Sequence, residues 1–215
     1  MHLLLDHNGY LPCISVITIG KVHDVTVAWT LKLLRGTVSV DDRGCNDYEL
    51  FGCWTDDGVY FVTRLKGNAA YRVVKNLTAP TKADSAVRMD QIIRFTGSQA
   101  KNRCPNELHL VTFYDAEQQR KFQLLTNNFR LAATAIALSY KDRWIVELIF
   151  KALKQNLKIT AFVGTSPPAV KTRFWTALIA MLLLLMQLKA KWEWSMSNPV
   201  ALLRMNQFTH RDLWA

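Results

Sequence analysis

The sequence of 215 residues lacks the patterns of several common sites. Its four cysteines form no C-x-x-C pair, and no histidine stands at zinc-finger spacing from them. This argues against a structural zinc site, and we expect reduced thiols in a cytoplasmic protein. A glycine-rich phosphate loop and a G-x-S-x-G nucleophile elbow are also absent, so the sequence predicts neither a P-loop nor a serine-hydrolase site.

Long hydrophobic runs are scarce as well. One run, "FWTALIAMLLLLMQL", covers residues 174–188 and has basic residues on both sides. It is shorter than the roughly 20 residues that a helix needs to cross a bilayer. The opening "MHLLLDHNGY" has no basic segment before its short apolar run, so we do not expect a signal peptide. We predict a buried core helix over 174–188 and no membrane partner.

Positive charge is plentiful but unevenly distributed. The formal net charge is +10, from 27 lysines and arginines against 17 aspartates and glutamates. Residues 1–66 carry 6 basic and 8 acidic residues, whereas residues 67–215 carry 21 basic and 9 acidic residues. A basic bulk with a locally acidic region is typical of a protein that binds a polyanion and also collects cations. Nucleic acid is one candidate for that polyanion.

The first 66 residues alternate strand-like and helix-like segments. Asn8 and Gly9 favour a hairpin turn between the first two strands, and Asn46 and Gly58 are suited to begin and end the second helix. The order β-β-α-β-α-β predicts an α/β fold with a central sheet. The strand-like runs stand at 2–6, 13–20, 37–42 and 59–66, and the helix-like runs at 21–36 and 46–58.

The pattern changes after residue 66. Four strand-like runs with alternating basic and apolar residues are separated by turn-rich pieces up to residue 128, and helical patterns dominate from there. We therefore predict an N-terminal part at 1–66, a β-rich insertion at 67–128 and a C-terminal helical part at 129–215. The expected strands are 71–77, 86–95, 107–115 and 120–127, and the expected helices are 130–138, 140–157, 167–191 and 198–205.

The predicted helix at 140–157 carries polar side chains at regular spacing. Tyr140, Arg143, Glu147, Lys151 and Lys154 are separated by 3, 4, 4 and 3 residues, which places them on one face of a helix. One interpretation is a solvated face with ion pairs, each contributing roughly 0.2–0.5 kcal/mol. The other is that Glu147 holds a metal ion beside a bound polyanion.

A second acidic position follows the predicted strand at 37–42. Asp42 stands where this strand gives way to a loop, and carboxylates at such strand ends often point into a crevice. A helix-start signal in a turn is the simpler interpretation. Together with Glu147, however, Asp42 supplies the oxygen ligands that Mg²⁺ uses when it binds phosphates.

These residues resemble a known family. The row from Tyr140 to Lys154 matches the Y-(2)-R-(3)-E-(6)-K signature of bacterial insertion-sequence DDE transposases, and "DRGCNDY" at 42–48 resembles their box around the second catalytic Asp. "LLDHNGYLP", "GKVHD", "YFVTRLK" and "LKITAFVGTSPPAVKTRFW" also look like stretches from this group. The resemblance covers essentially the whole chain.

The resemblance implies an RNase H-like α/β fold, a mixed sheet flanked by helices with a β-rich insertion before the Glu-bearing helix. Asp42 and Glu147 would be catalytic and would bind Mg²⁺ or Mn²⁺. The DNA-binding residues would be Tyr140, Arg143, Lys151 and Lys154. The implied partners are transposon ends, target DNA and a second copy of the chain in a synaptic complex, with association with the nucleoid when DNA is bound.

The sequence also departs from the family pattern. The family's first catalytic Asp lies in a D-S-T-like stretch on a strand before the one matching "HLLLD", and Asp6 does not match it. Asp41 and Cys45 replace the usual apolar and aromatic residues. We therefore expect a truncated copy without the first strand and with little or no cleavage by itself. The alternatives are a non-catalytic DNA-binding remnant that modulates full-length transposase, and another nuclease of the RNase H class.

Overall fold

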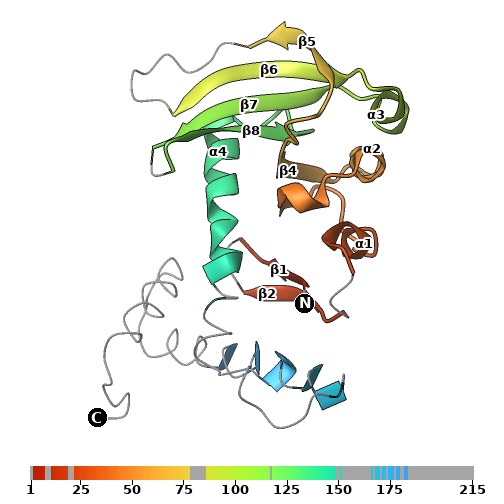
Figure 1. Ribbon diagram of the computed structural model, residues 1–215, viewed down its shortest axis with the longest axis vertical. Helices are drawn as coiled ribbons and strands as arrows, with labels where there is room; N and C mark the ends of the chain where they lie inside the picture. Colours follow the sequence, from red (N-terminus) through yellow and green to blue (C-terminus); the bar gives the residue numbers. More distant parts are fainter. Residues whose placement is uncertain are drawn as a thin grey trace. The chain divides into compact units, whose positions relative to one another are not determined.

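The chain divides into two compact units in the computed structural model (Figure 1). One unit is Lys21–Arg143, and the other combines Met1–Gly20 with Trp144–Ala215. The structure describes residues 2–7, 11–18, 22–77, 86–116, 118–148, 151, 166, 168–169, 171–172, 174–176, 178–179 and 182–183.

A six-stranded mixed sheet forms the centre of the Lys21–Arg143 unit. Its strand order is β3-β4-β8-β7-β6-β5, with β3 and β4 parallel and every other neighbouring pair antiparallel. Helices flank this sheet, so the α/β, RNase H-like fold class expected from the sequence is confirmed. The strands are β3 (Val38–Asp41), β4 (Tyr60–Arg64), β5 (Tyr71–Asn76), β6 (Val87–Phe95), β7 (Leu108–Asp115) and β8 (Arg120–Thr126).

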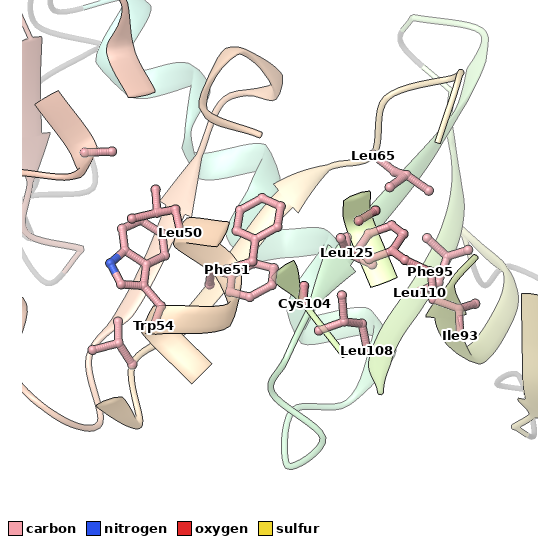
Figure 2. Close-up of a cluster of buried hydrophobic side chains, with 14 residues drawn as sticks. Leu50, Phe51, Trp54, Leu65, Ile93, Phe95, Cys104, Leu108, Leu110 and Leu125 are labelled. Atoms are coloured by element: carbon pink, nitrogen blue, oxygen red, sulfur yellow. The ribbon is translucent and has the colours of Figure 1, made fainter. Parts of the chain in front are cut away.

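One face of the sheet packs against three helices, α1 (Asp24–Ala28), α2 (Tyr48–Asp57) and α3 (Ser98–Arg103). Figure 2 shows side chains of α2 gathered with those of the strands in this cluster. The rings of Phe51 and Phe61 stack with their centroids 4.3 Å apart. Apolar burial of this kind is the main stabilising term of such a layer.

The close approach of α2 and α3 requires a glycine. A Cβ atom on Gly52 would stand 2.3 Å from the carbonyl oxygen of Arg103, which is far inside van der Waals contact. Gly52 is buried in the middle of α2, where glycine has a low helix propensity. Its presence there is explained by packing and not by helix formation.

The opposite face of the sheet packs against α4 (Ala133–Asp142). Ile136 and Ala137 of this helix lie over Phe113 and Phe122, whose rings stack at 5.2 Å. Neighbouring residues on a strand belong to opposite faces, as Leu124 and Leu125 of β8 do. Because both faces are covered, the central strands read as nearly continuous apolar runs.

Four sequence predictions for the helices differ from the structure. The division into helices at 130–138 and 140–157 is wrong, because α4 runs without a break from Ala133 to Asp142 and is followed by a turn at Arg143. The helix expected at 21–36 ends at Ala28, and the turn-rich stretch after Gly97 contains α3. The second helix is present, but Asp47 begins it and Asn46 does not: Asp47 Oδ1 accepts hydrogen bonds from the N–H groups of Glu49 and Leu50. Gly58, with φ of 73°, ends the helix as expected.

All four strands expected within residues 67–128 are present, as β5 to β8. They are hydrogen-bonded into one sheet with β3 and β4, because β8 pairs with β4. The proposed boundaries at 66/67 and 128/129 stay predictions.

The second unit contains a hairpin of β1 (His2–Leu5) and β2 (Pro12–Val16), paired antiparallel as predicted. The Asn-Gly turn between them, most of the expected helix at 167–191 and all of the one at 198–205 lie outside the described residues. Residues 144–148 are helical. Within the described part of the chain, no helix is long and apolar enough to span a membrane.

Candidate functional site

The parallel strands β3 and β4 end side by side and position Asp42. Asp41 closes β3 opposite Thr63 of β4, and Asp42 is the next residue of the chain. Asp42 is the N-cap of a short 3-10 turn at Arg43–Cys45. Its Oδ1 atom accepts a hydrogen bond from the N–H of Arg43 at 2.8 Å. The Asp42 side chain is 53% exposed, so its carboxylate can reach a ligand in solvent.

The loop that carries Asp42 is fixed to the end of β4 by side-chain hydrogen bonds. The hydroxyl of Thr63 donates to the Asp42 carbonyl at 3.3 Å and to Asn46 Oδ1 at 2.9 Å. Asn46 Nδ2 donates to the carbonyl of Arg64 at 2.9 Å, and Lys66 Nζ donates to the carbonyl of Asn46 at 3.1 Å. Asn46, expected to cap a helix, therefore connects two strand ends instead.

The C-terminal end of α4 brings an aromatic and a basic group to the same place. Arg143, the C-cap of α4, lies with Nη2 4.0 Å from Asp42 Oδ1, at the limit of an ion pair. Its guanidinium also stands over the ring of Tyr140, 5.7 Å from the centroid. Burial raises the pKa of the Tyr140 hydroxyl, the Arg143 guanidinium opposes this rise, and the nearby Asp42 carboxylate adds to it. Asp42, Tyr140 and Arg143 thus form a cluster, called here the Asp42 cluster.

Asp41 differs sharply from its neighbour. Its Oδ1 accepts a hydrogen bond from the Ser39 hydroxyl at 3.1 Å, whereas its buried Oδ2 has no hydrogen-bond partner among the described residues. Burial raises the pKa of this carboxyl to about 6, and the Ser39 hydrogen bond opposes part of that rise. The residue as a whole is only half-buried, but the carboxyl oxygen that lacks a partner is the buried part.

The thiol of Cys45 reports the local electrostatic potential. Its pKa is raised to about 12, mainly by burial and in part by the carboxylates of Asp41, Asp24 and Asp42, while Arg143 opposes these contributions. Three carboxylates therefore act on one small region, with Arg143 as the opposing positive charge. Such a region is suited to attract cations. The binding of cations expected from the acidic balance of residues 1–66 stays a prediction.

Comparison with known proteins settles the family. The family described as the transposase DDE domain matches residues 1–183. The chain belongs to this family. The identification made from the Tyr140–Lys154 signature and the Asp42 box is thereby confirmed.

Three bacterial relatives of this DDE domain are named as transposases. The y4zB protein of Sinorhizobium fredii is 32% identical over 188 residues, which are 86% of this chain and 52% of its own length. A Geobacillus stearothermophilus protein, named for insertion sequence element IS5377, is 30% identical over 86% of this chain and 48% of its own length. A Synechocystis protein named for insertion sequence element IS4SA is 27% identical over 68% of this chain and 40% of its own length. The chain spans about half the length of the curated relatives it matches.

The structure brings together some of the predicted site residues of the DDE domain. Asp42, Tyr140 and Arg143 meet in the Lys21–Arg143 unit. Glu147 and Lys151, both exposed, belong to the other unit, so the pairing of Asp42 with Glu147 stays a prediction. Lys154 lies outside the described residues.

The metal that a DDE site implies fits the Asp42 cluster in part. An exposed carboxylate at a fixed strand end is a suitable oxygen ligand for Mg²⁺ or Mn²⁺. Within the described ranges, no three His, Cys, Asp or Glu side chains are grouped so that they could hold a metal ion. Among the described residues, the Asp42 cluster therefore offers one oxygen ligand suited to such an ion.

Sequence reasoning missed the residues that support the site. Thr63 and Lys66 had no predicted role and Asn46 was expected to begin a helix, although all three fix the loop of Asp42. Arg64 lies in "YFVTRLK", a stretch already noted for its resemblance, and that was the available signal. The structure shows that this stretch matters because β4 ends beside β3.

Proposed function

We propose that this chain forms part of a transposase site that cleaves and joins DNA strands with the help of divalent cations. The observation that carries the proposal is Asp42, held at the end of β3 beside Arg143 and Tyr140. The family match and the signature residues support it. Asp42 and Glu147 hold the cations, which we expect to be Mg²⁺ or Mn²⁺.

The residues of the site have separate roles in this proposal. Divalent cations, when bound, supply charge stabilisation to the oxygens of the reacting phosphate. Arg143 forms a planar, two-pronged contact with a DNA phosphate and keeps the Asp42 carboxylate in place before DNA binds. Tyr140 supports the guanidinium of Arg143 from below. Lys151 and Lys154 extend the contact with the DNA backbone as point charges.

A metal titration tests the ligand assignment without relying on activity. Binding of Mn²⁺ is measured by calorimetry for the wild type and for Asp42→Asn, Glu147→Gln and Glu107→Gln. We expect the first two substitutions to weaken binding by about tenfold or more, since each removes a charged ligand. Glu107, which pairs with Arg94, is the matched control and should leave binding unchanged. Wild-type affinity in Asp42→Asn would contradict the assignment.

A nicking assay separates cleavage from binding alone. Supercoiled plasmid is incubated with the chain and Mg²⁺ or Mn²⁺, and the binding of a labelled duplex is measured in parallel. Nicking that is lost in Asp42→Asn supports a catalytic chain. Binding without nicking favours a DNA-binding form that modulates full-length transposase, and in that case the synaptic dimer is the partner to test.

A further inference from the structure

Two arginines from different strands converge on one ring next to the Asp42 cluster. The guanidinium carbon of Arg64, at the end of β4, lies 4.7 Å from the ring centroid of Phe122, and that of Arg120, at the start of β8, lies 4.5 Å from it. The two positive groups are therefore no further apart than the sum of these distances, about 9 Å. Phe122 itself is buried and stacked on Phe113, so the ring is a rigid support.

Both arginines lie on the face of the sheet that α4 covers. Val62 and Phe122 belong to the cluster under α4, and residues two apart on a strand share a face. Arg64 follows Val62 by two positions, and Arg120 precedes Phe122 by two. Because β4 and β8 are antiparallel, the end of one strand adjoins the start of the other.

The pair is continuous with the Asp42 cluster. Tyr140 packs against the same apolar cluster as Phe122. The carbonyl of Arg64 accepts a hydrogen bond from Asn46, in the loop that carries Asp42. The electrostatic influence of Arg64 and of Asp42 also meets at the Tyr140 hydroxyl. The arginine pair and the Asp42 cluster are thus linked through neighbouring residues within the Lys21–Arg143 unit. The successive residues are Asp42, Arg143, Tyr140, Arg64 and Arg120.

The charge of the pair is left for a ligand to neutralise. The arginine ion pairs among the described residues involve Arg94, Arg103 and Arg143, and neither Arg64 nor Arg120. Two guanidinium groups this close repel each other, and the ring offsets only part of that repulsion. A phosphate oxygen placed between them removes the repulsion and accepts charge-assisted hydrogen bonds from both.

We propose that Arg64 and Arg120, supported by Phe122, form a second phosphate-binding position that holds the DNA backbone beside the Asp42 cluster. This inference rests on the proposed function and names residues that extend its DNA contact across the sheet. Arg120 belongs to β8 and Arg64 to β4. This second phosphate-binding position therefore depends on the pairing of these two strands and not on the signature residues from Tyr140 to Lys154.

Salt-dependent binding of a labelled duplex by the full chain tests the position. Arg64→Gln and Arg120→Gln should each lower the slope of log affinity against log salt by about 0.9 and weaken binding roughly 5- to 10-fold near 0.1 M salt. The matched control is Arg88→Gln, because Arg88 also stands over an aromatic ring, that of Tyr114 at 5.7 Å. Tyr114 follows Phe113, which belongs to the α4 face, so Tyr114 and the Arg88 guanidinium over it lie on the other face of the sheet. Equal effects of all three substitutions would overturn the proposal.

Arginine modification of the wild-type chain gives a second test that needs no variant. Phenylglyoxal labelling, read by mass spectrometry, should show Arg64 and Arg120 protected by duplex DNA and Arg88 unprotected. If DNA binds but leaves Arg64 and Arg120 reactive, this inference fails while the proposed function stands. If the chain binds no DNA, the proposed function fails first. Equal protection by inorganic polyphosphate at the same phosphate concentration would overturn the assignment to DNA.

Discussion

Adjacent aspartates at the end of β3 have opposite environments. Asp42 is half exposed and lies beside Arg143, whereas the Oδ2 atom of Asp41 is buried without a hydrogen-bond partner among the described residues. A buried carboxyl group favours its neutral form, because burial penalises charge. Asp42 is thus suited to bind a cation, and Asp41 lowers the stability of the fold at neutral pH.

Replacing Asp41 by Asn should therefore stabilise the protein. The pKa of Asp41 is raised from 3.8 to about 6 by burial, so the folded state retains a proton that the unfolded state has lost. Stability should fall as pH rises from about 4 to about 6, by about 3 kcal/mol at most. Asp41→Asn should remove this dependence. Urea unfolding between pH 4 and 7, with chelator present, measures it.

The control for this prediction is Asp56→Asn, which removes an exposed carboxylate of α2. It should leave the pH dependence as it is in the wild type. Identical pH profiles for the wild type and Asp41→Asn would show that Asp41 ionises as freely in the folded chain as in the unfolded one.

Single residues also show what the sequence could and could not predict about the site. Asp42, Tyr140 and Arg143 were found because their motifs have fixed spacing along the chain. Arg64 and Arg120 were not, because their convergence on Phe122 depends on the register of β4 against β8. No local pattern contains that register.

At the scale of the elements, the alternation of polar and apolar residues predicted the strands well. The helical spacing of apolar residues predicted the helices less well. The strands β4, β6, β7 and β8 have covered apolar faces that leave a clear pattern, whereas β5 is exposed from Arg72 to Asn76. The helix expected at 21–36 stops at Ala28, and Trp29 and Leu34 beyond it are 43% and 81% exposed. Apolar spacing without a surface to cover it does not sustain a helix. The six-residue α3 is too short for periodicity to reveal.

One buried side chain connects three elements, and its removal should be costly. Asn127, just after β8, accepts a hydrogen bond from the Phe61 N–H at 3.0 Å. It donates to the Val59 carbonyl and to the Thr55 hydroxyl, each at 2.9 Å. Asn127→Ala leaves these buried groups unpaired and should cost about 2–4 kcal/mol of unfolding free energy. Urea denaturation measures the loss.

Asn68→Ala is the matched control, because Asn68 is exposed in the turn after β4. Its effect should stay within about 0.5 kcal/mol. A loss of similar size in both variants would mean that the Asn127 hydrogen bonds contribute nothing beyond the ordinary effect of the substitution.

At the scale of the molecule, both buried clusters lie within the Lys21–Arg143 unit. A fragment of these residues should therefore fold alone and unfold cooperatively in urea. It retains Arg64, Arg120 and Arg143 and should still bind duplex DNA, while it lacks Glu147. A gradual, non-cooperative transition of the fragment would show that the unit depends on the rest of the chain.

The hydrogen bonds of Thr63 and Asn46 have a thermodynamic consequence for binding. They order the backbone around Asp42 when the sheet forms, so the entropy of ordering that loop is lost during folding and not when a ligand arrives. A carboxylate on a preorganised loop binds a cation more tightly than the same group on a flexible loop. Thr63 has no contact with the cation or with DNA in the proposed function. Replacing it should nevertheless weaken cation binding, because the loop that carries Asp42 would lose its order.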